Sequence, residues 1–180
     1  MHNRQSIRLH GYNYANPGYY FITIVTQDRE SRFGEVVDDT MVLNGAGKMV
    51  TQWIDELPSK FDNCVIDSFV IMPNHIHILI VTGEHSVASP IPSLFDIIGW
   101  FKTMTTNEYI RRVKQSDWPP FRKRLWQQRY HDHIIRNEDS YHQIRDYIDT
   151  NPMRWAADCL NQKVDGLREE RAVYGESLML

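Results

Sequence analysis

Two histidines lie two residues apart in the apolar stretch "MPNHIHILI", which runs from Met72 to Ile80. Because side chains alternate between the two faces of a β-strand, His75 and His77 share one face and the isoleucines share the other. Two neutral imidazoles on one strand face can bind a single metal ion and leave positions for further ligands and substrate. The pattern is short and also fits a half-exposed strand whose histidines are satisfied by neighbours, so a third ligand elsewhere would favour the metal site.

A tyrosine and an amide occur together later in the chain, in "YIDTNP". Tyr147 and Asn151 are four residues apart and are therefore neighbours on one helix face. A phenol is a poor nucleophile at its ordinary pKa of about 10, but it can attack a phosphodiester whose phosphate is held by a metal ion. Tyr147 as the nucleophile and Asn151 as a third ligand, facing the two histidines, would make such a site. Either residue alone is more often a packing aromatic or a helix-terminal amide.

The elements that would position these residues follow the order β-α-β-β-α-β. The sequence predicts a strand over 18–26, a helix capped by Asn44, two antiparallel strands within 64–81, a long helix from Leu94, and a short strand at "RLWQQ", residues 124–128. This order is typical of the ferredoxin-like split βαβ fold of the α+β class. Both helices would cover one face of an antiparallel sheet. We expect the histidines on the opposite, free face, outside the core.

A further helix would carry the tyrosine. Tyr141, Ile144 and Ile148 form an apolar stripe, and the helix should end at Asn151 because the residue before a proline avoids the α region. We expect one domain over residues 1–180, with a core at about 7–155 and a C-terminal arm at 156–180.

Composition indicates a packed globule, since 42% of the residues are hydrophobic. The sequence has no apolar run of membrane-spanning length, and its first residues lack the apolar core of a signal peptide. Cys64 and Cys159 are the only cysteines, which suits a reducing compartment and builds no disulfide framework. These features predict a cytoplasmic protein with no membrane partner.

Basic residues concentrate in one stretch. Between Phe101 and Arg136, nine lysines and arginines face three acidic residues, a net charge of +6, whereas the whole chain carries −3. Such asymmetry fits a basic face for nucleic acid on an otherwise acidic protein, although a charged stretch alone also fits a solvated helix and loop. The residues expected to contact DNA are Lys102, Arg122, Lys123, Arg124, Arg129 and, as a stacking platform that equally fits a core position, Trp126.

Five stretches, taken together and in this order, resemble the REP-associated tyrosine transposases, which are single-tyrosine HUH endonucleases related to insertion-sequence transposases. They are "IRLHGYNYANPGYYFITIVTQDR" (7–29), "LNGAGKMV" (43–50), "FVIMPNHIHILI" (69–80), "WQQRYHDHIIRNE" (126–138) and "YIDTNPMRW" (147–155). The resemblance covers most of the chain. Residues 82–92 and the tail after Trp155 match no motif.

The resemblance implies a metal-dependent single-strand DNA endonuclease and strand transferase with a ferredoxin-like core. His75 and His77 match the family's metal ligands and Asn151 its metal-binding amide. Tyr147 matches the nucleophile, which forms a 5′-phosphotyrosine and leaves a free 3′-hydroxyl. The expected partner is single-stranded DNA folded as a hairpin, and the protein would act as a monomer or homodimer. The expected cofactor is Mg²⁺ or Mn²⁺, and two nitrogen ligands favour Mn²⁺.

Several alternatives compete with this interpretation. Tyr130 precedes His133 by three residues, so a helix there would also pair a tyrosine with a histidine, but it lacks the amide of "YIDTNP". We expect His131 and His133 to be surface residues or to support the site. A histidine-triad hydrolase would need a third alternate histidine where the chain has Leu79, and the helical parts do not suit a cupin. The main alternative is a DNA-binding module, derived from a transposase, that recognises hairpins without cleaving them.

Overall fold

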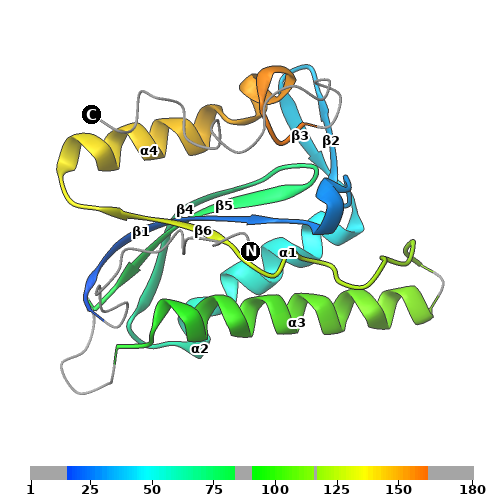
Figure 1. The fold of residues 1–180 in the computed structure, drawn as a ribbon, viewed down its shortest axis with the longest axis horizontal. Helices are drawn as coiled ribbons and strands as arrows, with labels where there is room; N and C mark the ends of the chain where they lie inside the picture. Colours follow the sequence, from blue (N-terminus) through cyan, green and yellow to red (C-terminus); the bar gives the residue numbers. More distant parts are fainter. Residues whose placement is uncertain (1–15, 84–90, 116, 162–180) are drawn as a thin grey trace, which may run out of the picture.

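A four-stranded antiparallel sheet forms the centre of the computed structural model, which describes residues 16–83, 91–115 and 117–161 (Figure 1). The strands are β1 (Gly18–Val25), β4 (Cys64–Ile71), β5 (His75–Thr82) and β6 (His131–Ile135), and their order across the sheet is β4-β5-β1-β6. Each neighbouring pair is antiparallel. This topology confirms the predicted α+β class and the split βαβ arrangement.

Helices cover both faces of the sheet. Helices α1 (Gly45–Asp55), α2 (Leu57–Lys60) and α3 (Leu94–Lys114) lie on one side, and α4 (Glu138–Thr150) lies on the other (Figure 1). A hairpin of β2 (Gly34–Val37) and β3 (Thr40–Leu43) and the short 3₁₀ helices η1 (Gln27–Arg29) and η2 (Pro152–Ala157) complete the fold. None of the described helices has the length and apolar character needed to cross a membrane.

Helix boundaries follow local capping chemistry. The side chain of Asn44 accepts hydrogen bonds from the backbone N–H groups of Ala46 and Gly47, as the predicted N-cap of α1 should. Asn137 caps α4 in the same way by accepting a hydrogen bond from the N–H of Ser140. Asn151 follows the last residue of α4, and Pro152 begins η2. The helix thus ends at the predicted residue, but the predicted reason is wrong, because Asn151 has α-region dihedrals (φ −58°, ψ −42°) and the chain continues into η2.

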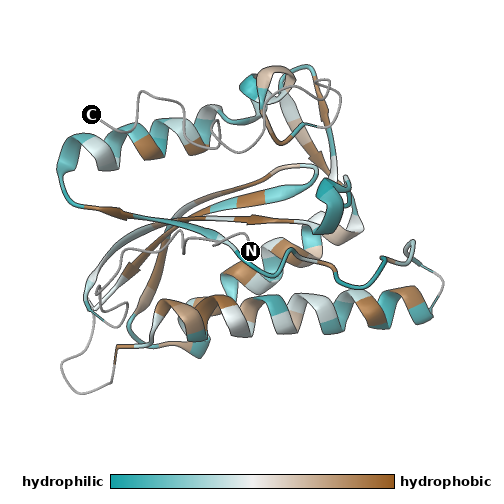
Figure 2. Cartoon of the chain, viewed as in Figure 1, coloured by the Kyte–Doolittle hydropathy of each residue, from teal (hydrophilic) through white to brown (hydrophobic). Residues whose placement is uncertain are grey.

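The sheet face that carries the histidines is not free, contrary to the sequence prediction. A second hydrophobic cluster lies there, made of Phe21, Leu79, Ile135, Ile144 and Ile148. The main core lies on the opposite face, under α1 and α3. The prediction placed both core helices on one face and did not assign a position to α4, which is largely hydrophilic with only a few apolar positions (Figure 2). Because those few are spaced on one side, they suffice to seat the helix on the sheet.

The predicted strand at residues 124–128 is wrong. Trp126 forms only an isolated bridge with Thr26, and the last strand of the sheet begins at His131. The Lys102 ammonium explains the interruption, because it donates to the carbonyls of Gln127 at 2.6 Å and Gln128 at 3.1 Å. Those carbonyls are therefore directed at helix α3, and strand pairing resumes only after this turn.

Trp126 is a core residue, so its predicted role as a stacking platform for DNA bases is not supported. Only 2% of its surface is exposed. Its ring packs against Phe33 and Phe101 with centroids 5.1 and 6.0 Å apart, and its indole N–H donates to the Thr105 hydroxyl at 2.9 Å. A buried tryptophan usually needs such a partner for its N–H.

This position yields the first prediction. Truncation of Trp126 to alanine should lower the free energy of unfolding by about 3–5 kcal/mol, because it removes a buried ring and leaves a cavity. Urea unfolding measures this loss. Among molecules that remain folded, affinity for DNA should be unchanged. A stable W126A protein with selectively weakened DNA binding would restore the stacking role.

Candidate functional site

The two histidines begin β5, directly after the turn at Pro73 and Asn74. In the register of the sheet, His77 lies opposite Thr23 of β1. His75 and His77 are buried, with 0% and 1% of their surface exposed. Their Nε2 atoms are 3.1 Å apart. The structure thus brings the predicted pair together, although in a buried position rather than on an open face.

Burial determines the charge of this pair. Desolvation lowers the pKa of His75 well below its ordinary value, and the neighbouring His77 lowers it further. Desolvation also lowers the pKa of His77, to about 3. Both imidazoles are therefore neutral near pH 7, the protonation state in which histidine binds metal ions.

Each imidazole is oriented by a hydrogen bond at its other nitrogen. Nδ1 of His77 lies 2.8 Å from the hydroxyl oxygen of Thr23, and Nδ1 of His75 lies 2.9 Å from Oδ1 of Asn74. The face of His77 also stacks on Phe21, with ring centroids 5.1 Å apart. Metal-binding histidines typically have such partners at the nitrogen that does not face the ion.

Helix α4 places Tyr147 beside this pair. Its hydroxyl lies 3.4 Å from Nε2 of His77, and the two ring centroids are 5.2 Å apart. Burial raises the pKa of Tyr147 to about 12, and the Asp158 carboxylate contributes to the rise, which the Asn151 amide and Arg154 oppose. The hydroxyl is therefore protonated at neutral pH and would need activation before attacking an electrophile.

Asn151 lies one helical turn after Tyr147 and is fully buried. Neither its Oδ1 nor its Nδ2 is within hydrogen-bond geometry of a partner among the described residues, although the amide is close enough to the Tyr147 hydroxyl to lower the pKa of that group. A buried polar side chain in that condition costs free energy. An amide in this position can supply an oxygen ligand to a bound ion.

These residues fit a divalent cation. Two adjacent ligand atoms of an octahedral ion at about 2.1 Å lie about 3 Å from each other, and the two Nε2 atoms are 3.1 Å apart. The unpartnered Asn151 amide supplies an oxygen donor of the kind that Mg²⁺ and Mn²⁺ accept. Among the residues described, no group of three or more His, Cys, Asp or Glu side chains is placed to hold a metal. The candidate set is therefore two imidazoles and one amide.

The rival nucleophile lies on the wrong side of the sheet. Tyr130 is 9% exposed and belongs to the main core under α1 and α3. The residues after it form β6 instead of the helix that would have paired it with His133. His131 and His133 are half-buried and lie opposite Thr23 and Phe21, on the same sheet face as His77.

The residues expected to contact DNA divide into two groups. Arg122, Lys123, Arg124 and Arg129 are exposed. Lys123 has a positive φ of 64°, and the Arg124 N–H donates to the Arg122 carbonyl at 2.7 Å, so the three cations project from one tight turn. Lys102 is instead engaged by two backbone carbonyls. Burial lowers the pKa of Lys102 to about 8, and Arg124 adds to that effect.

The sequence did not indicate the segment after Asn151 as part of the site. The ring of Trp155 lies 5.9 Å from that of His75. Arg29 donates to the Cys159 carbonyl at 3.2 Å, and the Leu160 carbonyl accepts a hydrogen bond from Asn74 at 2.7 Å. Residues 156–161, expected to belong to a C-terminal arm, thus pack against the site. Residues 162–180 lie outside the described part of the chain.

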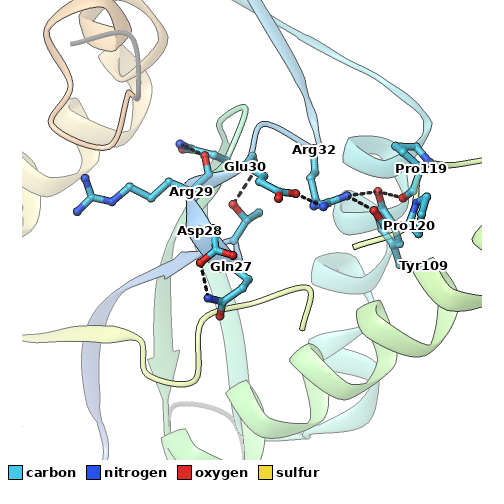
Figure 3. Close-up of polar contacts among 10 residues, drawn as sticks. Gln27, Asp28, Arg29, Glu30, Arg32, Tyr109, Pro119 and Pro120 are labelled. Atoms are coloured by element: carbon cyan, nitrogen blue, oxygen red, sulfur yellow. Dashed lines mark hydrogen bonds and ion pairs between the residues drawn. The ribbon is translucent and has the colours of Figure 1, made fainter. Parts of the chain in front are cut away.

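The loop between β1 and β2 is anchored through its arginines (Figure 3). Arg32 donates to the Tyr109 hydroxyl at 3.1 Å and to the Pro120 carbonyl at 3.4 Å, which ties the loop to α3 and the segment after it. Figure 3 shows Arg29 pointing the opposite way. Its backbone carbonyl accepts a hydrogen bond from Asn74 at 2.9 Å. No local pattern reveals these contacts, because they join residues far apart in the chain.

Comparison with known proteins gives one family. The sequence model described as "Transposase IS200 like" matches residues 16–151. An uncharacterized protein of Haemophilus influenzae is 38% identical, with 89% of this chain and 94% of that protein covered. A second Haemophilus influenzae protein, provisionally named a REP-associated tyrosine transposase, is 28% identical over 79% of this chain and 74% of its own length.

A solved structure shares the fold. It is that of a REP-associated tyrosine transposase bound to a REP hairpin, with a TM-score of 0.55 and 20% sequence identity. The similarity covers 82% of this chain and 73% of that one. At this identity the likeness supports the arrangement of strands and helices.

The buried imidazoles predict how stability depends on pH in metal-free buffer. The unfolded chain binds protons at the ordinary histidine pKa of 6.5, whereas folded His77 binds them only near pH 3. The contribution of His77 to the free energy of unfolding is therefore fully present above pH 6.5, and it is lost as the pH falls from 6.5 toward 3. Each such histidine contributes a slope of up to about 1.4 kcal/mol per pH unit.

Urea unfolding in EDTA between pH 7.5 and 5 measures this slope. His77→Gln should reduce it by up to about 1.4 kcal/mol per pH unit. His131→Gln is the matched control and should reduce it less, since that ring is only half-buried and the Asp132 carboxylate opposes the lowering of its pKa by burial. An unchanged slope in His77→Gln would show that His77 is not held neutral by the fold.

Proposed function

Because this chain belongs to the IS200-like transposase family, we propose that it is a metal-dependent, single-strand DNA endonuclease and strand transferase with Tyr147 as its nucleophile. The observation that carries the proposal is the contact between α4 and β5. A tyrosine hydroxyl lies 3.4 Å from one of two neutral imidazoles whose Nε2 atoms are 3.1 Å apart. The fully buried, unpartnered amide of Asn151 follows on the same helix face.

The chain's own residues would divide the chemistry between them. His75, His77 and Asn151 would hold Mg²⁺ or Mn²⁺, which when bound supplies charge to polarise the scissile phosphate. The Tyr147 oxygen would attack phosphorus as its proton passes to solvent. The bond from phosphorus to the 3′-oxygen breaks, and that oxygen takes a proton. The products are a 5′-phosphotyrosine and a free 3′-hydroxyl, and attack by a 3′-hydroxyl on the phosphotyrosine reverses the step.

The proposed substrate is single-stranded DNA that folds as a hairpin. The structural relative with the shared fold is bound to a REP hairpin, and this chain presents three exposed cations from the turn at 122–124. These side chains would contact phosphates, which fix position and supply affinity without reading sequence. One chain supplies all three residues of this contact, His75, His77 and Tyr147. A monomer would therefore be sufficient to form it, and a homodimer would not be needed.

One observation favours the non-cleaving alternative. His75, His77 and Asn151 are 0–1% exposed, so a phosphate cannot reach them unless part of the surrounding structure moves. A hairpin-binding module without nuclease activity would need no such movement. The formation of a covalent adduct decides between the two functions.

Tyr147→Phe should abolish the adduct and leave the fold and DNA affinity intact. The substitution removes only a hydroxyl, whose 3.4 Å contact with His77 is long for a hydrogen bond. The purified full chain would be incubated with labelled hairpin strands and Mn²⁺ and then resolved by denaturing electrophoresis. EDTA should prevent adduct formation by the wild type. Asn151→Ala should raise the Mn²⁺ concentration required.

Tyr130→Phe is the matched control, because it removes the same hydroxyl from the opposite face of the sheet. It should retain the adduct. An adduct that persists in Tyr147→Phe and disappears in Tyr130→Phe would assign the chemistry to the segment before β6. Hairpin binding by the wild type without any adduct, under all metal conditions, would favour the non-cleaving module.

The turn at 122–124 yields a separate prediction about binding. Replacing Arg122, Lys123 and Arg124 with glutamine should reduce the slope of log affinity against log salt by about 0.7–0.9 for each phosphate that these cations neutralise. Fluorescence anisotropy with a labelled hairpin measures this slope. Lys48→Gln/Lys60→Gln, at exposed positions of α1 and α2, should change it little. A triple variant with the wild-type slope would place the DNA elsewhere.

A further inference from the structure

Asn74 connects three parts of the chain through one buried amide. It is 1% exposed. Its Nδ2 donates to the carbonyl of Arg29 at 2.9 Å and to that of Leu160 at 2.7 Å. Because a carbonyl only accepts, both contacts require a nitrogen at that position. The orientation of the amide is thereby fixed, with its oxygen toward Nδ1 of His75 at 2.9 Å.

This orientation determines the tautomer of His75. An amide oxygen can only accept a hydrogen bond, so Nδ1 of His75 must carry the proton. A neutral imidazole has one N–H, and the lone pair is therefore on Nε2, the atom that faces His77. Free histidine in water prefers the other tautomer, with the proton on Nε2. The fold thus holds His75 in the less common form, ready to bind a metal ion.

His77 has a different kind of partner. The Thr23 hydroxyl at 2.8 Å can either donate to Nδ1 or accept from it. Because His75 has no proton on Nε2, the 3.1 Å contact between the two rings requires His77 to donate. Thr23 then donates to Nδ1 of His77. Binding of an ion requires His77 alone to move its proton to Nδ1, and the threonine hydroxyl can rotate to accept it.

We propose that Asn74 is a positioning residue that fixes the metal-binding tautomer of His75. The inference rests on the proposed function, in which His75 is a metal ligand. Asn74 need not contact the ion or the DNA. Its loss would leave His75 free to protonate Nε2, and that proton would then have to move before an ion could bind.

Nuclear magnetic resonance of the ¹⁵N-labelled full chain in EDTA tests the tautomer directly. Imidazole nitrogens with and without a proton differ widely in chemical shift, so the spectrum identifies which nitrogen carries it. Wild-type His75 should carry the proton on Nδ1. Asn74→Leu, which keeps the approximate shape and removes the acceptor, should shift His75 toward protonated Nε2. Thr23→Val is the matched control and should leave His75 unchanged.

Metal affinity tests the consequence without using catalysis. Electron paramagnetic resonance of free Mn²⁺ should show affinity about 10–100-fold weaker in Asn74→Leu than in wild type. Asn74→Asp keeps an acceptor for Nδ1 but cannot donate to the carbonyls of Arg29 and Leu160. It should therefore be less stable in urea while retaining the His75 tautomer and most of the Mn²⁺ affinity.

Two outcomes would overturn the inference. Wild-type His75 with its proton on Nε2 would do so even if no variant folds. Equally weakened Mn²⁺ affinity in Asn74→Asp and Asn74→Leu would show that Asn74 acts only by anchoring the backbone at Arg29 and Leu160. Wild type with the predicted tautomer but no Mn²⁺ binding would instead contradict the proposed metal-dependent function, so the two failures are distinguishable.

Discussion

The removal of two neutral imidazoles from water is the constraint on which the rest of this structure depends. A buried histidine requires partners for its nitrogens, and here Thr23, Asn74 and the second ring supply them. Each partner in turn has to be held in position by backbone from another part of the chain. The candidate site is therefore less a cluster of side chains on a surface than a polar layer between a sheet and a helix.

Helix α4 closes that layer, and only two of its residues, Ile144 and Ile148, are buried. Its apolar residues Ile144 and Ile148 meet Phe21 and Leu79. Near its start, the Tyr141 hydroxyl donates to Asp67 at 3.0 Å, beside the irregularity that shifts the register of β4. Most of its remaining surface is hydrophilic (Figure 2). Helix α4 has two buried residues, against five in α1 and six in α3, so it can separate from the sheet at a lower cost than they can. Access of a phosphate to the buried histidines would require such a movement, or a movement of the segment after Asn151.

The sequence predicted the features that depend on local pattern and missed those that depend on distant contacts. Alternating and helical periodicities located β1, β4, β5 and the helices, and the order of these elements indicated the topology. The strand expected at 124–128 failed because Lys102, some 25 residues earlier in the chain, directs carbonyls away from the sheet. The tight turn before His75 could be predicted from Pro73-Asn74. The hydrogen bonds from the Asn74 amide to the backbone carbonyls of Arg29 and Leu160 could not, because no spacing rule links those positions.

The bond between Asn74 and the Leu160 carbonyl also has a consequence for biosynthesis. Translation proceeds from the N-terminus, and domains generally fold as the chain emerges. The histidines are made early, whereas Tyr147, Asn151 and Leu160 leave the ribosome only after β6 has been made. A nascent chain can therefore pair β1 with β5 but cannot bring the tyrosine or the second carbonyl to the histidines. The proposed site would therefore be assembled only after α4 and the segment that reaches Leu160 have been made.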